Sequence, residues 1–172
     1  MQFKDLAAER YSVRKFSPEP VDAKTINEIL AIANLAPTAV NKQPFRILTL
    51  TTPDGMEKLA NCTKYTFHAP AAFIVCCVET EAWVRDYDNY NMGVVDASIV
   101  ATHLMLAIHD LGLGSTWVGH FDPIKVEEQF NLPSEIKPVV IFPFGHLADN
   151  VKPAPQHSKR RSLEEVVVYN HF

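Results

Sequence analysis

The amino-acid sequence predicts one domain, residues 1–172, in which helices and strands are mixed along the chain. Two apolar runs, Ala71–Val78 and Val139–Phe144, have the length and composition of buried strands. Segments with helical periodicity lie before and between these runs, and one of them, Met92–Leu111, is long. No repeat, low-complexity segment or flexible linker separates two parts of the chain, so a single domain is the simplest prediction.

The first half of the chain is expected to form three helices and two strands. Phe3–Glu9 and Pro53–Cys62 are short helical segments, whereas Ile47–Thr51 alternates as a half-buried strand does. A longer helix is expected at Asp22–Ala33, with Asp22 as its N-cap and an apolar face made of Ile26, Ile29, Leu30 and Ala33. Ala71–Val78 is continuously apolar, which favours a strand buried on both faces.

The second half of the chain is dominated by the helix from Met92 to Leu111, for which Gly112 is the expected C-cap. Strands are expected at Ser115–Val118 and Val139–Phe144, with a helix at Asp122–Phe130 between them. The tail, Lys159–Val168, is expected to end in a further strand.

Residues 94–108 of the long helix are apolar or small on nearly every face, so this helix cannot lie on the surface of a monomer. One explanation is that a sheet and other helices of the same chain bury it. The other is that it packs partly against a second subunit, which is a serious option for a chain of this size.

The composition argues against several classes of protein. A formal net charge of -4 and a sequence pI near 5.9 do not suit a general nucleic-acid binder, which needs a basic field. Cys76 and Cys77 are adjacent and would face opposite ways on a strand, so neither a disulfide framework nor a zinc site is expected. The N-terminus has no apolar signal region, and no stretch is long and uncharged enough to span a bilayer. We therefore expect a cytoplasmic protein with no membrane partner.

Common catalytic motifs are absent from the sequence: GxxxxGK[ST], GxSxG and HExxH do not occur. Gly112–Trp117 begins like a dinucleotide-binding fingerprint but lacks the third glycine. It also lies after a helix and before a strand, which is the reverse of the required order.

The stretch Arg10–Phe16 sets Arg10, Ser12 and Arg14 on alternate residues just beyond a short helix. In an extended segment these three side chains point to one face. Guanidinium groups pair with phosphate in bidentate geometry and a serine hydroxyl adds a further bond, so this face suits a phosphorylated ligand. The alternative is a solvated polar edge with Val13 and Phe16 packed inward.

Two further clusters carry groups suited to a ligand. In Ala36–Phe45, paired prolines bracket small polar residues and two amides, which favours a rigid loop able to bind a polar heterocycle or polyol. The alternative there is a structural Asx turn around Asn41. In Gly114–Pro123, a strand leads to Gly119, where a ligand could approach the bare backbone, and then to Asp122, a candidate N-cap.

Five motifs together resemble the FMN-dependent nitroreductase family. They are RYSVRKF, APTAVNKQPF, GLGSTWVGHFDP, FPFGH and SKRRSLEEVV, which occur in the family's order and cover nearly the whole chain. The resemblance implies an α+β fold with a central mixed, mostly antiparallel sheet flanked by helices. It also implies an intertwined homodimer with one FMN in each of two clefts at the interface, which would explain the apolar helix.

The resemblance assigns the flavin phosphate to Arg10 and Ser12, with Tyr11 between them, and to Arg160. Lys159 and Arg161 are neighbours of Arg160 whose register stays open. Arg14 would lie beside N1 and O2 of the isoalloxazine, where a fixed cation favours the reduced flavin.

The ring and ribityl chain would contact two other segments. The other subunit would lay a loop across them that contains Pro37, Thr38, Ala39 and Asn41. The remaining segment would run beside the dimethylbenzene edge and N5, with a backbone amide bonded to N5, and consists of Trp117, Val118 and Gly119. Many relatives carry glutamate at the position of Gly119, so only its backbone remains available here.

The reaction that the resemblance implies is that of a flavin oxidoreductase. NAD(P)H would give hydride to flavin N5 and leave, and an electron-poor acceptor such as a nitroaromatic or quinone would then bind the same face, in ping-pong order. No side chain need act as nucleophile or general base, and no metal is expected. Four aromatic residues are candidate walls of the substrate pocket, although an aromatic side chain more often belongs to the hydrophobic core. They are Tyr65, Phe67, Tyr87 and Phe121.

Two alternatives to this function remain open. One is a flavin-binding protein or sensor with little turnover. The other is a superfamily member with different flavin chemistry, such as dehalogenation or flavin fragmentation.

Overall fold

The central layer of the molecule is a four-stranded sheet with the order β1-β2-β6-β5, in a computed structural model that describes residues 2–172. The strands are β1 (Phe45–Leu50), β2 (Ala71–Val78), β5 (Gly114–Ser115) and β6 (Ile136–Gly145). Neighbouring strands are antiparallel, and one parallel bridge joins Ser12 to Ser115 at the β5 edge. The expected mixed, mostly antiparallel sheet is confirmed.

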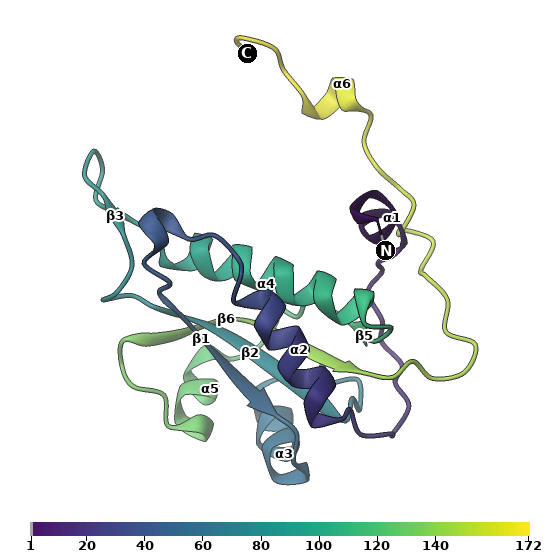
Figure 1. Cartoon of the computed structure of the whole chain (residues 1–172). Helices are drawn as coiled ribbons and strands as arrows, with labels where there is room; N and C mark the ends of the chain where they lie inside the picture. The colour runs from purple at the N-terminus through teal and green to yellow at the C-terminus, as the bar shows by residue number, and fades with distance from the viewer. Residues whose placement is uncertain (1) are drawn as a thin grey trace.

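Helices cover both faces of this sheet (Figure 1). On one face lie α2 (Ala23–Ala33) and α4 (Gly93–Asp110), and on the other lie α3 (Pro53–Cys62) and α5 (Pro123–Phe130). Because side chains alternate along a strand, β2 sends Phe73 toward α2 and α4, and Ile74 toward α3 and α5. Every residue of β2 is therefore buried, as its continuous apolar sequence predicts.

The helix ends follow the predicted caps. Asp22 Oδ1 accepts a 2.9 Å hydrogen bond from the Thr25 amide at the start of α2. Asp122 Oδ1 accepts bonds of 3.1 and 3.2 Å from the first amides of α5. At the far end of α4, Gly112 has a φ of 77°, a left-handed conformation in which glycine ends a helix without strain.

Two elements between β2 and β6 differ from expectation. The expected strand Ser115–Val118 is only partly present, because β5 ends at Ser115 and Val118 rejoins the sheet through bonds of 2.9 and 3.1 Å with Ile141. A short hairpin that the sequence did not predict, β3 (Val84–Arg85) and β4 (Tyr90–Asn91), connects β2 to α4. Its turn is held by two hydrogen bonds from Arg85 to Asp88, of 2.6 and 2.8 Å.

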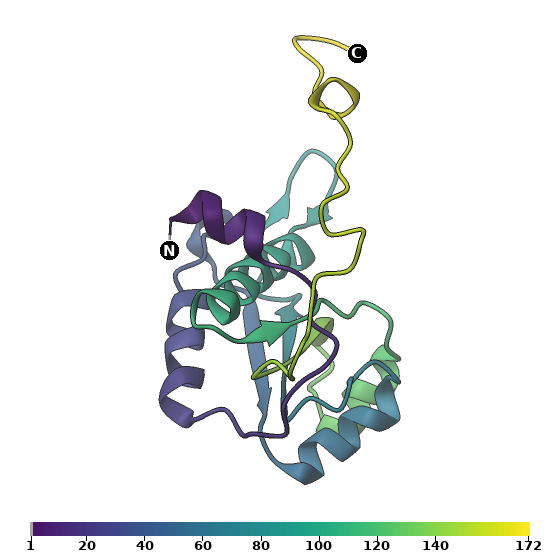
Figure 2. The same cartoon turned by 90° about the vertical axis from the view of Figure 1, so that its right-hand side faces the viewer.

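The strand expected at the end of the tail is wrong. The tail carries one short helix, α6 (Leu163–Val166), in which the Ser162 amide donates to Glu165 Oε2 at 2.9 Å. Figures 1 and 2 both show this tail leaving the body of the molecule. No strand within residues 2–172 pairs with the tail, so its valine-rich run lacks the neighbour that a strand requires.

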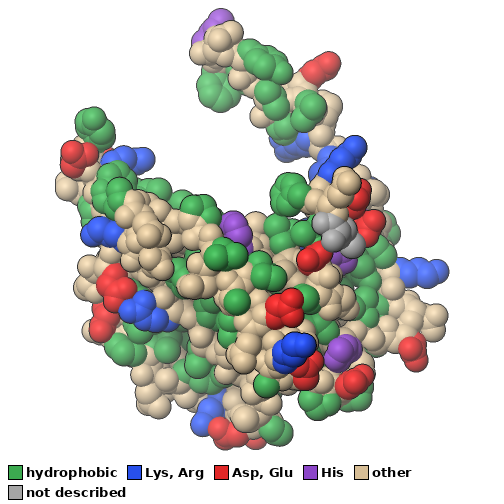
Figure 3. All heavy atoms as spheres, in the orientation of Figure 1, with side chains coloured by type: hydrophobic (Ala, Val, Ile, Leu, Met, Phe, Trp, Pro, Cys, Tyr) green, Lys and Arg blue, Asp and Glu red, His purple; other side chains and the backbone are tan. Residues whose placement is uncertain are grey.

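One side of α4 is buried in this chain and another is not. The side that faces the sheet and α2 includes Val100, Leu104 and Ile108, which are fully buried. On the outer side Val94 is 51% exposed, while Met105 and Leu106 are only partly covered. In Figure 3, apolar side chains reach the surface above the sheet, between the projecting hairpin and the projecting tail. The first explanation therefore holds for the buried side of α4, whereas packing against a second subunit stays a prediction for the outer side.

A close contact between β5 and the N-terminal segment generates a prediction about stability. A methyl group at position 114 would come within 2.7 Å of Val13 Cγ2, and Val13 is 1% exposed. We expect Gly114→Ala to lower the free energy of unfolding by about 1 to 3 kcal/mol, the usual cost of overpacking. Urea denaturation of the ligand-free protein measures this.

Gly119→Ala is the matched control, because a methyl group there meets nothing within 4 Å. Equal stabilities for the two alanine variants would show that the Val13 contact does not constrain β5.

Candidate functional site

The segment from Arg10 to Phe16 lies along the free edge of β5. The Val13 amide donates to the Ser115 carbonyl at 2.9 Å, and Ser12 forms the parallel bridge with Ser115. This extended course buries Val13 and turns Arg10, Ser12 and Arg14 toward a common cavity. The predicted shared face is present, and the inward packing of Val13 accompanies it.

A cavity of about 220 Å³, called here the anion pocket, brings the two ends of the chain together. It is lined by Arg10, Tyr11, Ser12, Arg14, Ala154, Gln156, His157 and Arg160. Burial, and secondarily the charge of Arg160, lowers the pKa of Arg10. The guanidinium groups of Arg10, Arg14 and Arg160 thus line one cavity, and that of Arg10 is partly desolvated, an arrangement that a bound anion would stabilise.

The structure distinguishes among the three basic residues of the tail. Arg160 lines the anion pocket, and its Nη1 donates to the carbonyls of His157 and Lys159 at 2.6 and 2.7 Å. Lys159 and Arg161 are exposed and do not line this pocket. Their predicted part in phosphate binding has no geometric support here.

Sequence reasoning missed Gln156 and His157, which enter the anion pocket beside Arg160. The His157 ring lies edge-on to Tyr11, with 6.0 Å between ring centroids. A signal was available in the sequence, because both residues stand within four positions of Arg160 and both can donate hydrogen bonds.

A second cavity, of about 330 Å³, adjoins the anion pocket and is called here the ring pocket. Its lining consists of Arg14, Tyr65, Phe67, Thr116, Trp117, Val118, Gly119 and His120. Arg14 lines both cavities, so its cation stands between them. Gly119 presents bare backbone to open space, which suits the close approach of a flat ligand.

The four candidate aromatic walls lie in three different places. Tyr65 and Phe67 line the ring pocket, and their ring centroids are 6.0 Å apart. Trp117 also belongs to the ring pocket, where its indole packs edge-on against Phe142 at 5.3 Å. Tyr87 is 93% exposed at the tip of the hairpin and lines neither the anion pocket nor the ring pocket of its own chain.

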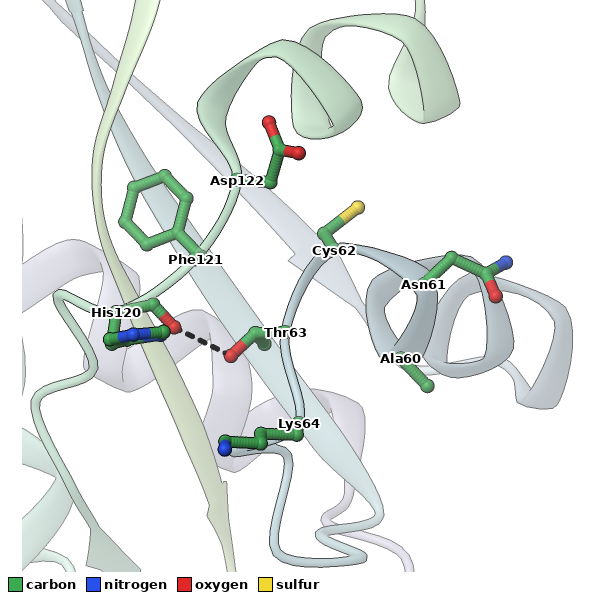
Figure 4. Close-up of a pocket in the computed structure, with 8 residues that line it drawn as sticks. All are labelled: Ala60, Asn61, Cys62, Thr63, Lys64, His120, Phe121 and Asp122. Carbon is green, nitrogen blue, oxygen red and sulfur yellow. Dashed lines mark hydrogen bonds between the residues drawn. The ribbon is translucent and has the colours of Figure 1, made fainter.

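Phe121 belongs to a neighbouring hollow of about 450 Å³ between the end of α3 and the start of α5 (Figure 4). Two polar groups of this hollow are already engaged in structural hydrogen bonds. Thr63 Oγ1 donates to the His120 carbonyl at 2.7 Å, and the Asp122 carboxylate caps α5. Burial, and then the charge of Asp122, raises the pKa of the Cys62 thiol, so this sulfur is not an activated nucleophile. We therefore place the candidate site in the two adjoining pockets and not in this larger hollow.

The loop that contains Pro37, Thr38, Ala39 and Asn41 is not brought to these pockets within one chain. Its Ala39 amide donates to Asp96 Oδ1 at 2.9 Å, on the first turn of α4. The anion pocket lies by β5, beyond the other end of α4 (Figure 1). An α-helix rises 1.5 Å per residue, so the part of α4 from Asp96 to its last residue, Asp110, spans roughly 21 Å.

Other kinds of site find no support in the part of the chain that is described. Across residues 2–172, no helix is long and apolar enough to span a membrane. Within the same residues, no three His, Cys, Asp or Glu side chains are grouped so as to hold a metal ion.

The anion pocket generates a prediction that needs no knowledge of the natural ligand. Inorganic phosphate should bind the ligand-free protein, and Arg160→Ala should weaken that binding by about 1.5 to 3 kcal/mol, the range for a hydrogen bond to a charged group. Isothermal titration calorimetry measures the affinity. Arg161→Ala removes a neighbouring exposed cation and should leave it nearly unchanged, so an equal loss in both variants would contradict the register found here.

Comparisons with known proteins all point to one family. The sequence matches the family model for the Nitroreductase family over residues 7–67 and 61–146. A protein from Methanothermobacter thermautotrophicus, provisionally named an NADH dehydrogenase/NAD(P)H nitroreductase, is 30% identical over 148 residues. That match covers 82% of this chain and 75% of the relative.

Solved structures show the same fold. A nitroreductase family protein from Clostridium difficile 630 superposes with a TM-score of 0.94 at 34% identity, with all of both chains covered. A provisionally named nitroreductase in complex with FMN, from Exiguobacterium sibiricum 255-15, has a TM-score of 0.84 at 19% identity and covers 98% of this chain and 97% of its own. From the family match and the identity to its relatives, the chain belongs to the nitroreductase family.

Proposed function

We propose that residues 1–172 act as one FMN-binding domain of an oxidoreductase that moves hydride from NAD(P)H to an electron-poor acceptor, such as a nitroaromatic or a quinone. The observation that carries this proposal is the pair of adjoining pockets that share Arg14. One is small and cationic, and the other is wider and has aromatic walls. FMN has the matching shape, because a phosphate and a flat ring stand at its two ends.

The anion pocket suits the phosphate end of FMN. Arg10 and Arg160 supply two guanidinium groups, and Ser12 supplies a hydroxyl within the same cavity. Burial lowers the pKa of Arg10, and the charge of Arg160 lowers it further, so the two cations repel each other in this pocket. A dianionic phosphate would remove that repulsion, so the residues present fit the group.

The ring pocket suits the isoalloxazine. Trp117, Val118 and Gly119 run along its wall, and the missing side chain at Gly119 leaves room against the backbone. Tyr65 and Phe67 add apolar surface from the segment after α3.

The chemistry divides between cofactor and protein. FMN, when bound, supplies the atom that accepts hydride from NAD(P)H and passes it to the acceptor. Arg14 holds a permanent positive charge at the junction of the pockets, which favours negative charge developing on a bound ring. Donor and acceptor use the ring pocket in turn, which gives ping-pong kinetics. No cysteine takes part as a nucleophile, because burial raises the pKa of each thiol, that of Cys76 to about 12.

The active unit in this proposal is a homodimer. The loop of residues 37–41 lies at one end of α4 and the anion pocket at the other, so a two-fold axis across the open face of α4 would bring the loop of one subunit to the pocket of its partner. The tail supports the same arrangement. Leu163, Tyr169 and Phe172 are exposed on it, and an apolar tail that leaves the body of its own chain is suited to docking on a second copy.

A spectroscopic and kinetic experiment tests the proposed function. The purified protein should be yellow with noncovalent FMN, and it should oxidise NADH or NADPH steadily when a nitroaromatic or quinone is present. Stopped-flow reduction with each nucleotide identifies the donor. A colourless protein that gains no FMN on incubation would contradict the proposal, and a yellow protein without turnover would favour a flavin-binding protein or sensor.

Arg14 should affect the potential of the bound flavin more than its affinity. Arg14→Gln removes the cation at the ring pocket, and we expect the two-electron potential to fall by roughly 30 mV for each 1.4 kcal/mol of lost differential stabilisation. Redox titration of the FMN-saturated variant measures this, with Arg161→Ala as the control for a general change in surface charge. An unchanged potential together with weaker FMN binding would place Arg14 with the phosphate ligands instead.

A further inference from the structure

We propose that Asp96 is a positioning residue, which holds residues 38–43 of one subunit in the shape that completes the flavin site of its partner. This inference rests on the proposed function, because it concerns the same two-chain site. The inference adds to that site a residue of α4 that lines neither the anion pocket nor the ring pocket of its own chain.

The Asp96 carboxylate is placed where a carboxylate is costly. Its side chain is 1% exposed, among the buried residues of α4 and the sheet. Oδ1 accepts one hydrogen bond, from the Ala39 amide at 2.9 Å, and Oδ2 has no partner within residues 2–172. Burying a polar oxygen without a partner is unfavourable, so an apolar side chain at this position would cost less free energy. We therefore infer that the bond to the Ala39 amide has a role that an apolar side chain could not fill.

Asp96 does not serve as a cap for its own helix. The residue at the N-cap position is Met92, which makes no side-chain capping bond, and the first amide of α4 is bonded instead to Asn91 Oδ1 at 2.9 Å. The one hydrogen bond of the Asp96 side chain therefore leaves the helix and reaches a residue 57 positions earlier in the sequence.

The loop that it reaches is strained. Val40, Asn41 and Gln43 have φ values of 45°, 56° and 53°, and a β-branched residue such as Val40 rarely adopts this conformation. The loop is closed by a 2.9 Å bond from the Gln43 amide to Thr38 Oγ1. Several hydrogen bonds inside the loop, together with the one that Asp96 accepts from the Ala39 amide, thus hold an unfavourable backbone in a defined shape.

This shape does not serve packing within the same chain. Val40 is 73% exposed, and the side chains from Asn41 to Gln43 are exposed as well. A strained loop with outward-facing side chains is suited to a contact outside its own subunit, where a defined shape lowers the entropy lost on binding. In the proposed homodimer that contact is the flavin site of the partner.

The experiment measures the loop and the cofactor separately. In Asp96→Ala, we expect the Ala39 amide of the FMN-free protein to exchange hydrogen much faster by NMR, and the dissociation constant for FMN to rise by about tenfold or more, the loss expected for a hydrogen bond to a charged group. Asp96→Asn keeps an acceptor oxygen, so its FMN affinity should lie nearer to wild type than to Asp96→Ala.

Asp22→Ala is the matched control, because it also removes a carboxylate that accepts from a backbone amide, at the start of α2. It should lower the melting temperature without changing FMN affinity or Ala39 exchange. The inference is overturned if Asp96→Ala keeps wild-type exchange at Ala39, if its FMN affinity stays within about twofold of wild type, or if Asp22→Ala weakens FMN binding equally.

The two proposals fail in different ways. If the wild-type protein takes up no FMN, the proposed function fails, while Ala39 exchange still reports whether Asp96 holds the loop. If the wild-type protein binds FMN and Asp96→Ala binds it equally well, only the role of Asp96 is lost.

Discussion

The contact between the N-terminal segment and the edge of β5 is the constraint on which the candidate site depends. The Val13 amide bonds to Ser115, and the Val13 side chain fills the space that a side chain at Gly114 would occupy. Because this segment is extended, burying Val13 turns Arg10, Ser12 and Arg14 to the opposite side. One apolar contact and one backbone bond thus fix three polar side chains, and β5 continues directly into the residues of the ring pocket.

The two ends of α4 carry different parts of the proposed site. Near the C-terminal end of α4, the chain presents the anion pocket and the ring pocket, with two cations held close together. Near its N-terminal end, the chain presents a strained loop bonded to Asp96. In the proposed homodimer, the two ends contribute to the same ligand site. The apolar outer face of α4 lies between them and is suited to pairing with a second copy, which would bring unlike ends together.

Much of the fold could be predicted from the sequence because the signals for its helices and strands are local. The bounds of α1 (Phe3–Glu9), α3 and β2 follow from the apolar periodicity of the sequence and from the Pro and Thr residues that flank these segments. The caps at Asp22 and Asp122 follow from side-chain chemistry.

The errors arise mainly where a distant partner decides the outcome. The valine-rich tail has strand propensity but no adjacent strand in its own chain, so the local Ser162 to Glu165 bond prevails and a helical turn forms. A different reason applies to the hairpin at residues 84–91, which is polar and depends on the local Arg85 to Asp88 pair, so no apolar alternation indicates it. Arg160 lines the anion pocket, and Lys159 and Arg161 do not, because of the way the tail crosses the N-terminal segment. The spacing of basic residues in the sequence does not reveal this crossing.

Whether one flavin site is built from two chains can be measured directly by subunit complementation. Arg10→Ala damages the anion pocket of a chain, and Asn41→Ala damages the exposed loop that is proposed to reach the partner. A heterodimer of these two variants, purified with two different affinity tags, contains one site made from the intact pocket of one chain and the intact loop of the other. We predict that this heterodimer binds one FMN with near wild-type affinity, while each variant homodimer binds FMN weakly at both sites. A heterodimer that binds FMN as weakly as the two homodimers would contradict the two-chain site.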